Sequence, residues 1–127
     1  MSKLIDALMV KPMKIPQITR LCTDRRYLDA AVSVGADAEC SATVLEISDN
    51  LGILYAWDAP ALGMLGNRKI GNRIIPGIFY VVGYKDGHLN SLSPDEIAEY
   101  TCKFQNPEIF THDEIVNSWF DGLFCAL

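Results

Sequence analysis

The sequence lacks the short motifs that mark most metal sites, nucleotide sites and hydrolytic centres. Its four cysteines are widely spaced and form no Cys-x-x-Cys pair, which argues against a structural zinc site. It has only two histidines, His88 and His112, and no His-x-x-x-His pair, P-loop, dinucleotide fingerprint or Gly-x-Ser-x-Gly turn. These absences predict a protein that is not an enzyme, with no catalytic residues, no metal site and no cofactor.

Long hydrophobic runs are also missing. The longest apolar stretch, over 74–84, contains Pro76, Gly77 and Gly83 and is too short to span a bilayer. Charged residues interrupt the apolar segment over 4–10, so no signal peptide is expected. Disulfide frameworks normally occur in secreted proteins, and no secretion signal is expected here. We therefore expect a cytoplasmic protein whose cysteines are reduced and mostly buried. We expect no membrane partner.

Basic charge is scarce, since 11 Lys and Arg against 16 Asp and Glu leave a formal net charge of −5 over 127 residues. General nucleic-acid binding needs a dense basic face and is therefore not expected. The charge is uneven. Residues 1–84 hold nine basic and eight acidic side chains, whereas residues 85–127 hold two basic and eight acidic ones. The acidic excess lies in the C-terminal third.

The chain does have enough apolar material for one packed domain, because 50% of its residues are hydrophobic. Alternating or β-branched segments predict strands over 5–10, 17–21, 41–47, 53–57 and 74–84. We predict an α+β fold: a small, mainly antiparallel sheet of about five strands with two or three helices packed on one face. Residues 1–110 form this domain, and residues 111–127 form an amphipathic helix that packs on it or at an interface.

Capping residues predict where the helices begin. Thr23 precedes a helical apolar pattern over 24–34. Ser93 and Glu96 form a capping box with Pro94 at the first helical position, and Asn106-Pro107 ends that helix. Thr111 and Glu114 form a second capping box before the last helix.

The segment over 67–73 is the strongest candidate for ligand binding, and we read 67–72 as a polar turn. Arginine binds phosphate or carboxylate in a bidentate manner, and asparagine hydrogen-bonds a base edge or ribose. The candidate ligand-binding residues are Asn67, Arg68, Lys69, Asn72 and Arg73. The competing interpretation is a solvated turn whose cations pair with the acidic C-terminal helices. Arg25 and Arg26 form a weaker cationic pair at a helix start, where cations oppose the helix dipole.

Large apolar side chains gather near the end of the chain and are candidates for a partner interface. They are Trp119, Phe120, Leu123 and Phe124. Aromatic residues commonly anchor protein–protein interfaces, including those of homodimers. The alternative is that these side chains cover the protein's own sheet.

Several short motifs follow one another between residues 67 and 110. They are Asn67-Arg68, a hydrophobic strand over 74–83, the turn Lys85-Asp86-Gly87, the cap Ser91-Leu92-Ser93-Pro94-Asp95, Ile97, Tyr100, Phe104 and the ending Asn106-Pro107-Glu108-Ile109-Phe110. This order resembles the family catalogued as domain of unknown function 3846. The first strand, ending in Val10-Lys11-Pro12, is also similar, so the resemblance spans residues 5–110 and is specific over 67–110.

The centre of the chain departs from that family. Residues 34–40 stand where the family has Gly-Gly-aromatic-Ile-Glu, and residues 56–60 replace its Asn-Glu-Glu-Gly turn. The family has no assigned activity, and its members recur in bacterial phages, plasmids and conjugative elements. By association, the resemblance implies a non-catalytic accessory protein of such an element that binds a protein partner and inhibits a host defence component. The alternative function is binding of an anionic, nucleotide-like small molecule through 67–73.

Overall fold

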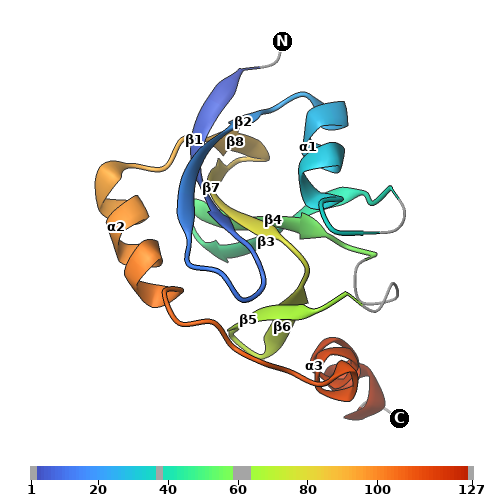
Figure 1. The fold of residues 1–127 in the computed structure, drawn as a ribbon. Helices are drawn as coiled ribbons and strands as arrows, with labels where there is room; N and C mark the ends of the chain where they lie inside the picture. The colour runs from blue at the N-terminus through green and yellow to red at the C-terminus, as the bar shows by residue number, and fades with distance from the viewer. Residues whose placement is uncertain (1–2, 37–38, 59–63, 126–127) are drawn as a thin grey trace.

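The main sheet of this protein has six strands and is antiparallel, so the predicted α+β class is confirmed (Figure 1). The computed structural model describes residues 3–36, 39–58 and 64–125, with side chains described as far as Trp119. The strands are β1 (Leu4–Val10), β2 (Gln17–Cys22), β3 (Ala42–Ser48), β4 (Leu51–Ala56), β7 (Phe79–Lys85) and β8 (His88–Asn90). Their order is β2-β1-β7-β4-β3, which leaves β2 and β3 at the two edges.

The strand β8 extends the sheet on the β1 side of β7. The first half of β7 pairs with β1, and its second half pairs with β8. The main-chain N–H of Leu92 then donates to the carbonyl of Asp6 at 2.9 Å. This bond ties the segment after β8 to β1, where β1 has separated from β7.

The helices lie on both faces of the sheet, although the sequence predicted one covered face. α1 (Arg25–Val32) packs on the face that carries Ile5, Leu54 and Val82. α2 (Pro94–Lys103) packs on the face that carries Leu8, Ile53 and Val81, and Figure 1 shows the sheet between the two helices. All six residues of β4 are buried, so each face of the central strands requires its own cover.

A second, two-stranded sheet stands beside the main one and replaces the polar turn predicted over 67–72. It consists of β5 (Gly66–Ile70) and β6 (Arg73–Pro76), with α3 (His112–Cys125) packed against β6. The prediction of one strand over 74–84 is also wrong, because Gly77 interrupts it with a φ of +75°. Glycine reaches this left-handed region without a Cβ clash. The break lets residues 74–76 pair with β5 while 79–85 join the main sheet.

Two of the three predicted helix caps are confirmed. Ser93 and Glu96 exchange the two hydrogen bonds of a capping box, and Thr111 and Glu114 do the same at 2.9 and 3.2 Å. α1 differs, because its cap is Asp24, whose carboxylate accepts the main-chain N–H of Arg26 at 3.0 Å.

Among the described residues, no helix is both long and apolar enough to cross a bilayer.

The cysteines were expected to be mostly buried. Cys40 is buried and Cys22 is half-buried, whereas Cys102 is exposed. The side chain of Cys125 lies outside the described residues.

Tyr80 makes the stability of this fold sensitive to alkaline pH. Its hydroxyl is buried, donates to the carbonyl of Ala31 at 3.1 Å, and has its pKa raised to about 12 by burial. An unfolded tyrosine ionises near pH ~10, so the unfolded chain releases a proton that the folded chain keeps. The free energy of unfolding should therefore fall as pH rises from about 10 to about 12.

Urea unfolding of the wild type and Tyr80→Phe at several pH values checks this prediction. The variant loses one hydrogen bond, on the order of 1 kcal/mol, at every pH, but its alkaline decline should be shallower. Tyr55 and Tyr100 also have pKa values raised by burial, and they are present in both proteins, so the difference between the two curves isolates Tyr80. Parallel curves would contradict the prediction.

Candidate functional site

Asn67, a predicted ligand-binding residue, is a buried link between strands. Its Nδ2 donates to the carbonyls of Val10 and Gly77, each at 2.8 Å, and its Oδ1 accepts from Arg68 Nη1 at 2.8 Å. The side chain is fully buried, and both amide hydrogens are used. Asn67 therefore joins β5 to the end of β1 and to the turn before β7.

Arg68 is fully buried as well, and its guanidinium is directed at main-chain carbonyls. Nε and Nη2 donate to Phe104 O at 3.1 and 2.8 Å, and Nη2 also donates to Lys14 O at 2.7 Å. Phe104 is the C-cap of α2, where the helix dipole favours a positive charge. Burial lowers the pKa of Arg68, and the carboxylate of Glu108 opposes that effect.

The basic segment therefore does not form the single ligand site that its sequence predicted. Because their donors are used inside the fold, we assign Asn67 and Arg68 a structural role. Lys69, Asn72 and Arg73 are exposed, and the Arg73 guanidinium lies over the ring of Trp119 at 4.9 Å. Arg68 and Lys69 are successive residues of β5, so their side chains point to opposite faces. Asn67 is buried together with Arg68 because the register of β5 shifts between Gly66 and Arg68.

The aromatic cluster predicted as a partner interface is only partly described. Trp119 is half-buried, its Nε1 donates to Ile74 O at 2.8 Å, and its ring lies 5.4 Å from that of Tyr55. Trp119 therefore covers the protein's own strands. The side chains of Phe120, Leu123 and Phe124 lie outside the described residues.

The free edge of β2 is a candidate site that the sequence patterns missed. The main-chain N–H of Thr23 donates to Lys3 O, and from there hydrogen-bonded pairs of β1 and β2 recur at every second residue. The N–H and C=O groups of Ile18 and Arg20 must then point away from β1. Among the described residues, no hydrogen bond reaches these outward main-chain groups.

Large exposed apolar side chains lie on β2 and in the loop that precedes it. Met13 and Ile15 lie in the loop between β1 and β2, and their exposed fractions are 51% and 66%. Ile18, on β2 itself, is 66% exposed. Isolated exposed apolar residues are common, but three within six residues beside an open strand edge are typical of an interaction surface. We call Met13, Ile15, Ile18 and the outer edge of β2 the β2 surface.

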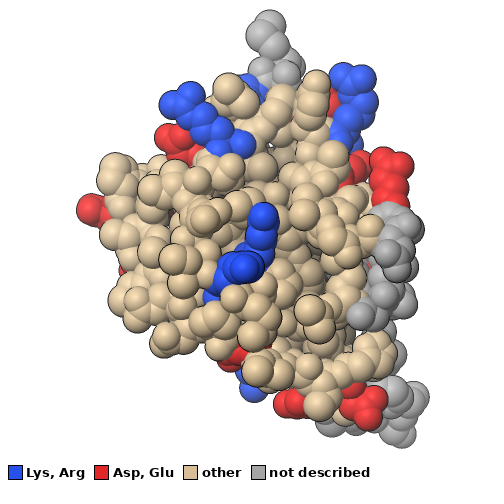
Figure 2. Space-filling model, viewed as in Figure 1, with Lys and Arg blue, Asp and Glu red and all other residues tan. Residues whose placement is uncertain are grey.

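The β2 surface is also basic. Lys11 and Lys14 lie in the same loop, and Figure 2 shows a group of Lys or Arg side chains over the β1–β2 hairpin with mainly uncharged surface around it. Arg20 adds a third cation, which contacts Asp6 at 3.4 Å across the strand pair. In the sequence, these lysines are dispersed among apolar residues, so no basic run marked them.

Replacing Asn67 tests its structural role. Asn67→Ala should lower the free energy of unfolding by about 2–4 kcal/mol, because buried carbonyls and one guanidinium N–H lose their partners. The exposed Asn72 supplies a matched control, and Asn72→Ala should change stability by less than about 0.5 kcal/mol. Urea unfolding measures both. Equal effects of the two substitutions would refute the structural assignment of Asn67.

Comparison with known proteins adds no assignment to this geometry: no family model, curated protein or solved structure matched the chain. The resemblance to domain of unknown function 3846 stays a prediction.

Proposed function

We propose that this chain is a non-catalytic protein-binding domain whose partner adds an extended segment to the free edge of β2. One observation carries the proposal: the outward main-chain groups of the edge strand β2 have no hydrogen bond among the described residues, and three exposed apolar side chains, Met13, Ile15 and Ile18, lie on β2 or in the loop before it. Strand addition draws affinity from main-chain hydrogen bonds and specificity from alternate side chains. The hypothesis of a protein partner is thus kept, and its surface moves from α3 to β2.

The other sheet edge supports this choice by contrast, because α1 covers the start of β3. Arg25 Nη2 donates to Ala42 O at 2.8 Å, and Asp29 Oδ1 accepts from Ala42 N at 2.9 Å. These two side chains supply the donor and acceptor that a neighbouring strand would offer. Proteins commonly protect edge strands in such ways, whereas no hydrogen bond within the described part of the chain reaches the corresponding groups of Ile18 and Arg20.

Charge indicates the chemistry of the partner segment. Lys11 and Lys14 lie in the same loop as Met13 and Ile15, and Arg20 lies on β2 with Ile18, where it contacts Asp6. A segment that alternates acidic and apolar residues would complement both the lysines and the apolar side chains. In an extended strand, alternate side chains face the same side, so one face of the segment meets Ile18. A host defence protein is the partner class suggested by the family resemblance.

Selection from a displayed library of random ten-residue peptides tests this proposal even while the partner is unidentified. Enriched peptides should combine Asp or Glu with β-branched residues. Their binding should shift the amide resonances of 17–22. Ile18→Asp should weaken the best peptide at least tenfold, because it adds a charge and removes apolar contact.

Ile109 provides a matched control, since it is 82% exposed and lies in the segment between α2 and α3, outside β2 and the loop before it. Ile109→Asp introduces the same charge and should leave peptide affinity within about twofold, on the scale of a neutral surface change. Enrichment without acidic residues, or equal losses for both variants, would contradict the proposed surface. If light scattering shows a dimer that Ile18→Asp abolishes, the segment paired with β2 belongs to a second copy of this chain and not to a different protein.

A further inference from the structure

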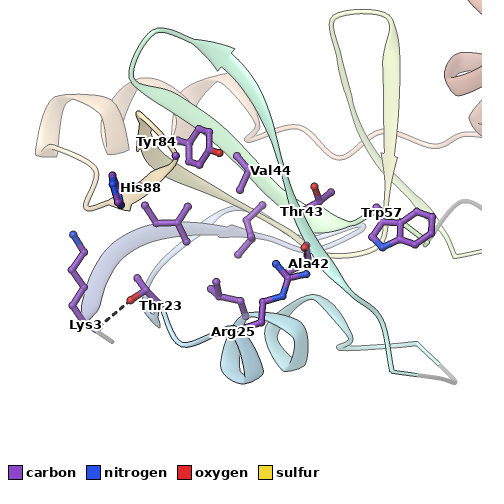
Figure 3. A pocket seen from close by; sticks show the side chains of 13 residues that line it. Lys3, Thr23, Arg25, Ala42, Thr43, Val44, Trp57, Tyr84 and His88 are labelled. Atoms are coloured by element: carbon purple, nitrogen blue, oxygen red, sulfur yellow. Dashed lines mark hydrogen bonds between the residues drawn. The ribbon is translucent and has the colours of Figure 1, made fainter. Parts of the chain in front are cut away.

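A groove of about 820 Å³ lies at the Lys3 end of β1, whereas Met13, Ile15 and Ile18 of the β2 surface lie toward its Val10 end. α1 has only eight residues, and Arg25 and Leu28 from its N-terminal half line the groove. The groove lies between this helix, β3 and that turn, and Figure 3 shows the side chains that line it. Its volume falls in the range of small-molecule sites, roughly 300–1,000 Å³.

The floor of the groove is apolar and belongs to the packed core. Leu54 and Leu28 are buried there, and the partly buried Val44 and Leu89 extend the same apolar surface. A floor of this kind accepts the flat or aliphatic body of a ligand. Polar groups above it then determine which ligand is bound.

The polar lining consists largely of hydrogen-bond donors. Lys3 and His88 lie at one end of the view in Figure 3, and the Arg25 guanidinium lies nearer its centre. Lys3 Nζ also donates to Asn90 Oδ1 at 3.3 Å, and Thr23 Oγ1 accepts from the main-chain N–H of Lys3 at 3.0 Å. Thr43 and Tyr84 add two further hydroxyls to the lining. None of the described residues that line the groove carries a carboxylate. Cationic and hydroxyl donors without a lining acid favour an anionic ligand.

Arg25 is held in position before any ligand arrives. Its Nε contacts Asp29 Oδ1 at 3.2 Å, and its Nη2 donates to Ala42 O at 2.8 Å. These contacts leave Nη1 without a hydrogen bond among the described residues. Asp29 offsets part of the charge, but its Oδ1 is already used by Arg25 and by Ala42 N. A preorganised donor loses less side-chain entropy on binding.

Trp57 lies at the other end of the row of labelled side chains in Figure 3, and its exposed fraction is 62%. An exposed indole face is a stacking platform for an aromatic ring, worth about 1–3 kcal/mol for a nucleobase. The groove therefore combines cationic donors at one end with a flat aromatic surface at the other.

A second groove, of about 450 Å³, fits an anion less well. It is lined by Asn72 and Arg73, two residues that the sequence predicted to bind a ligand, and by Lys103. It also contains the carboxylate of Glu46, which opposes an anion, and Arg73 is already stacked on Trp119. The groove of about 820 Å³ is the better candidate, because none of its described lining residues carries a carboxylate and Arg25 Nη1 makes no hydrogen bond among the described residues.

We propose that the groove between α1, β3 and the β7–β8 turn binds a small anion that carries an aromatic ring, with a nucleoside phosphate as the defining chemistry. The phosphate contacts Lys3 and Arg25, and the ring stacks on Trp57. This site is separate from the β2 surface, so the two proposals stand or fall independently.

Titration of the full chain with ATP, adenosine and inorganic triphosphate, followed by amide resonances and calorimetry, tests the proposal. ATP should bind most tightly because it carries both the ring and the charge, and its shifts should cluster on residues 23–28, 42–44 and 84–89. Lys3→Glu should weaken ATP at least tenfold, and Trp57→Ala should weaken it about threefold or more. Trp57→Ala should leave inorganic triphosphate unchanged.

Lys11→Glu is the matched control for Lys3→Glu. It makes the same change in net charge at the other end of β1, about 26 Å away at ~3.3 Å per strand residue. The control should retain ATP affinity within about threefold, as expected for a screened, distant charge. Absence of any shift at 10 mM ATP would overturn the proposal. Equal losses for Lys3→Glu and Lys11→Glu, or shifts confined to other residues, would overturn it as well.

Discussion

The buried guanidinium of Arg68 is the interaction on which the arrangement of this fold depends. It connects β5 to the end of α2 through Phe104 O and to the β1–β2 loop through Lys14 O. Asn67, the preceding residue, connects β5 to the end of β1 through Val10 O and to the turn before β7 through Gly77 O. A buried cation is costly unless its donors are satisfied, so these segments must meet in one arrangement. Two adjacent side chains thereby join β5 to residues 10–14, to the turn at Gly77 and to the end of α2 at Phe104.

This link also explains where the two candidate surfaces lie. The β1–β2 loop is anchored from inside by Arg68 at Lys14 O, so its apolar side chains are held at the surface beside the free β2 edge. At the other end of β1, the short α1 uses Arg25 and Asp29 to cover the start of β3, and the groove opens beside it. The start of β3 is thus protected by side-chain hydrogen bonds, whereas no hydrogen bond from the described residues reaches the outward main-chain groups of Ile18 and Arg20 on β2.

Local patterns predicted local structure well. The capping boxes at Ser93 and Thr111 and the strands predicted over 41–47 and 53–57 depend on residues close in the sequence, and the structure contains both capping boxes and the strands β3 and β4. Patterns failed where the outcome depended on distant segments. Asn67 and Arg68 resemble an exposed polar turn until their partners, Val10, Lys14 and Phe104, are known. Trp119 was equally ambiguous, because an aromatic side chain suits a core and an interface alike.

The sequence by itself determined the α+β class and the approximate positions of most strands and helices, because hydrophobic period and capping chemistry act over a few residues. Tertiary structure decided which charged side chains are buried and which sheet edge stays open. Three cations in 67–73 look equivalent in the sequence, yet strand alternation buries Arg68 and exposes Lys69. The edge position of β2 follows from strand order, a property of long-range pairing that no local pattern records.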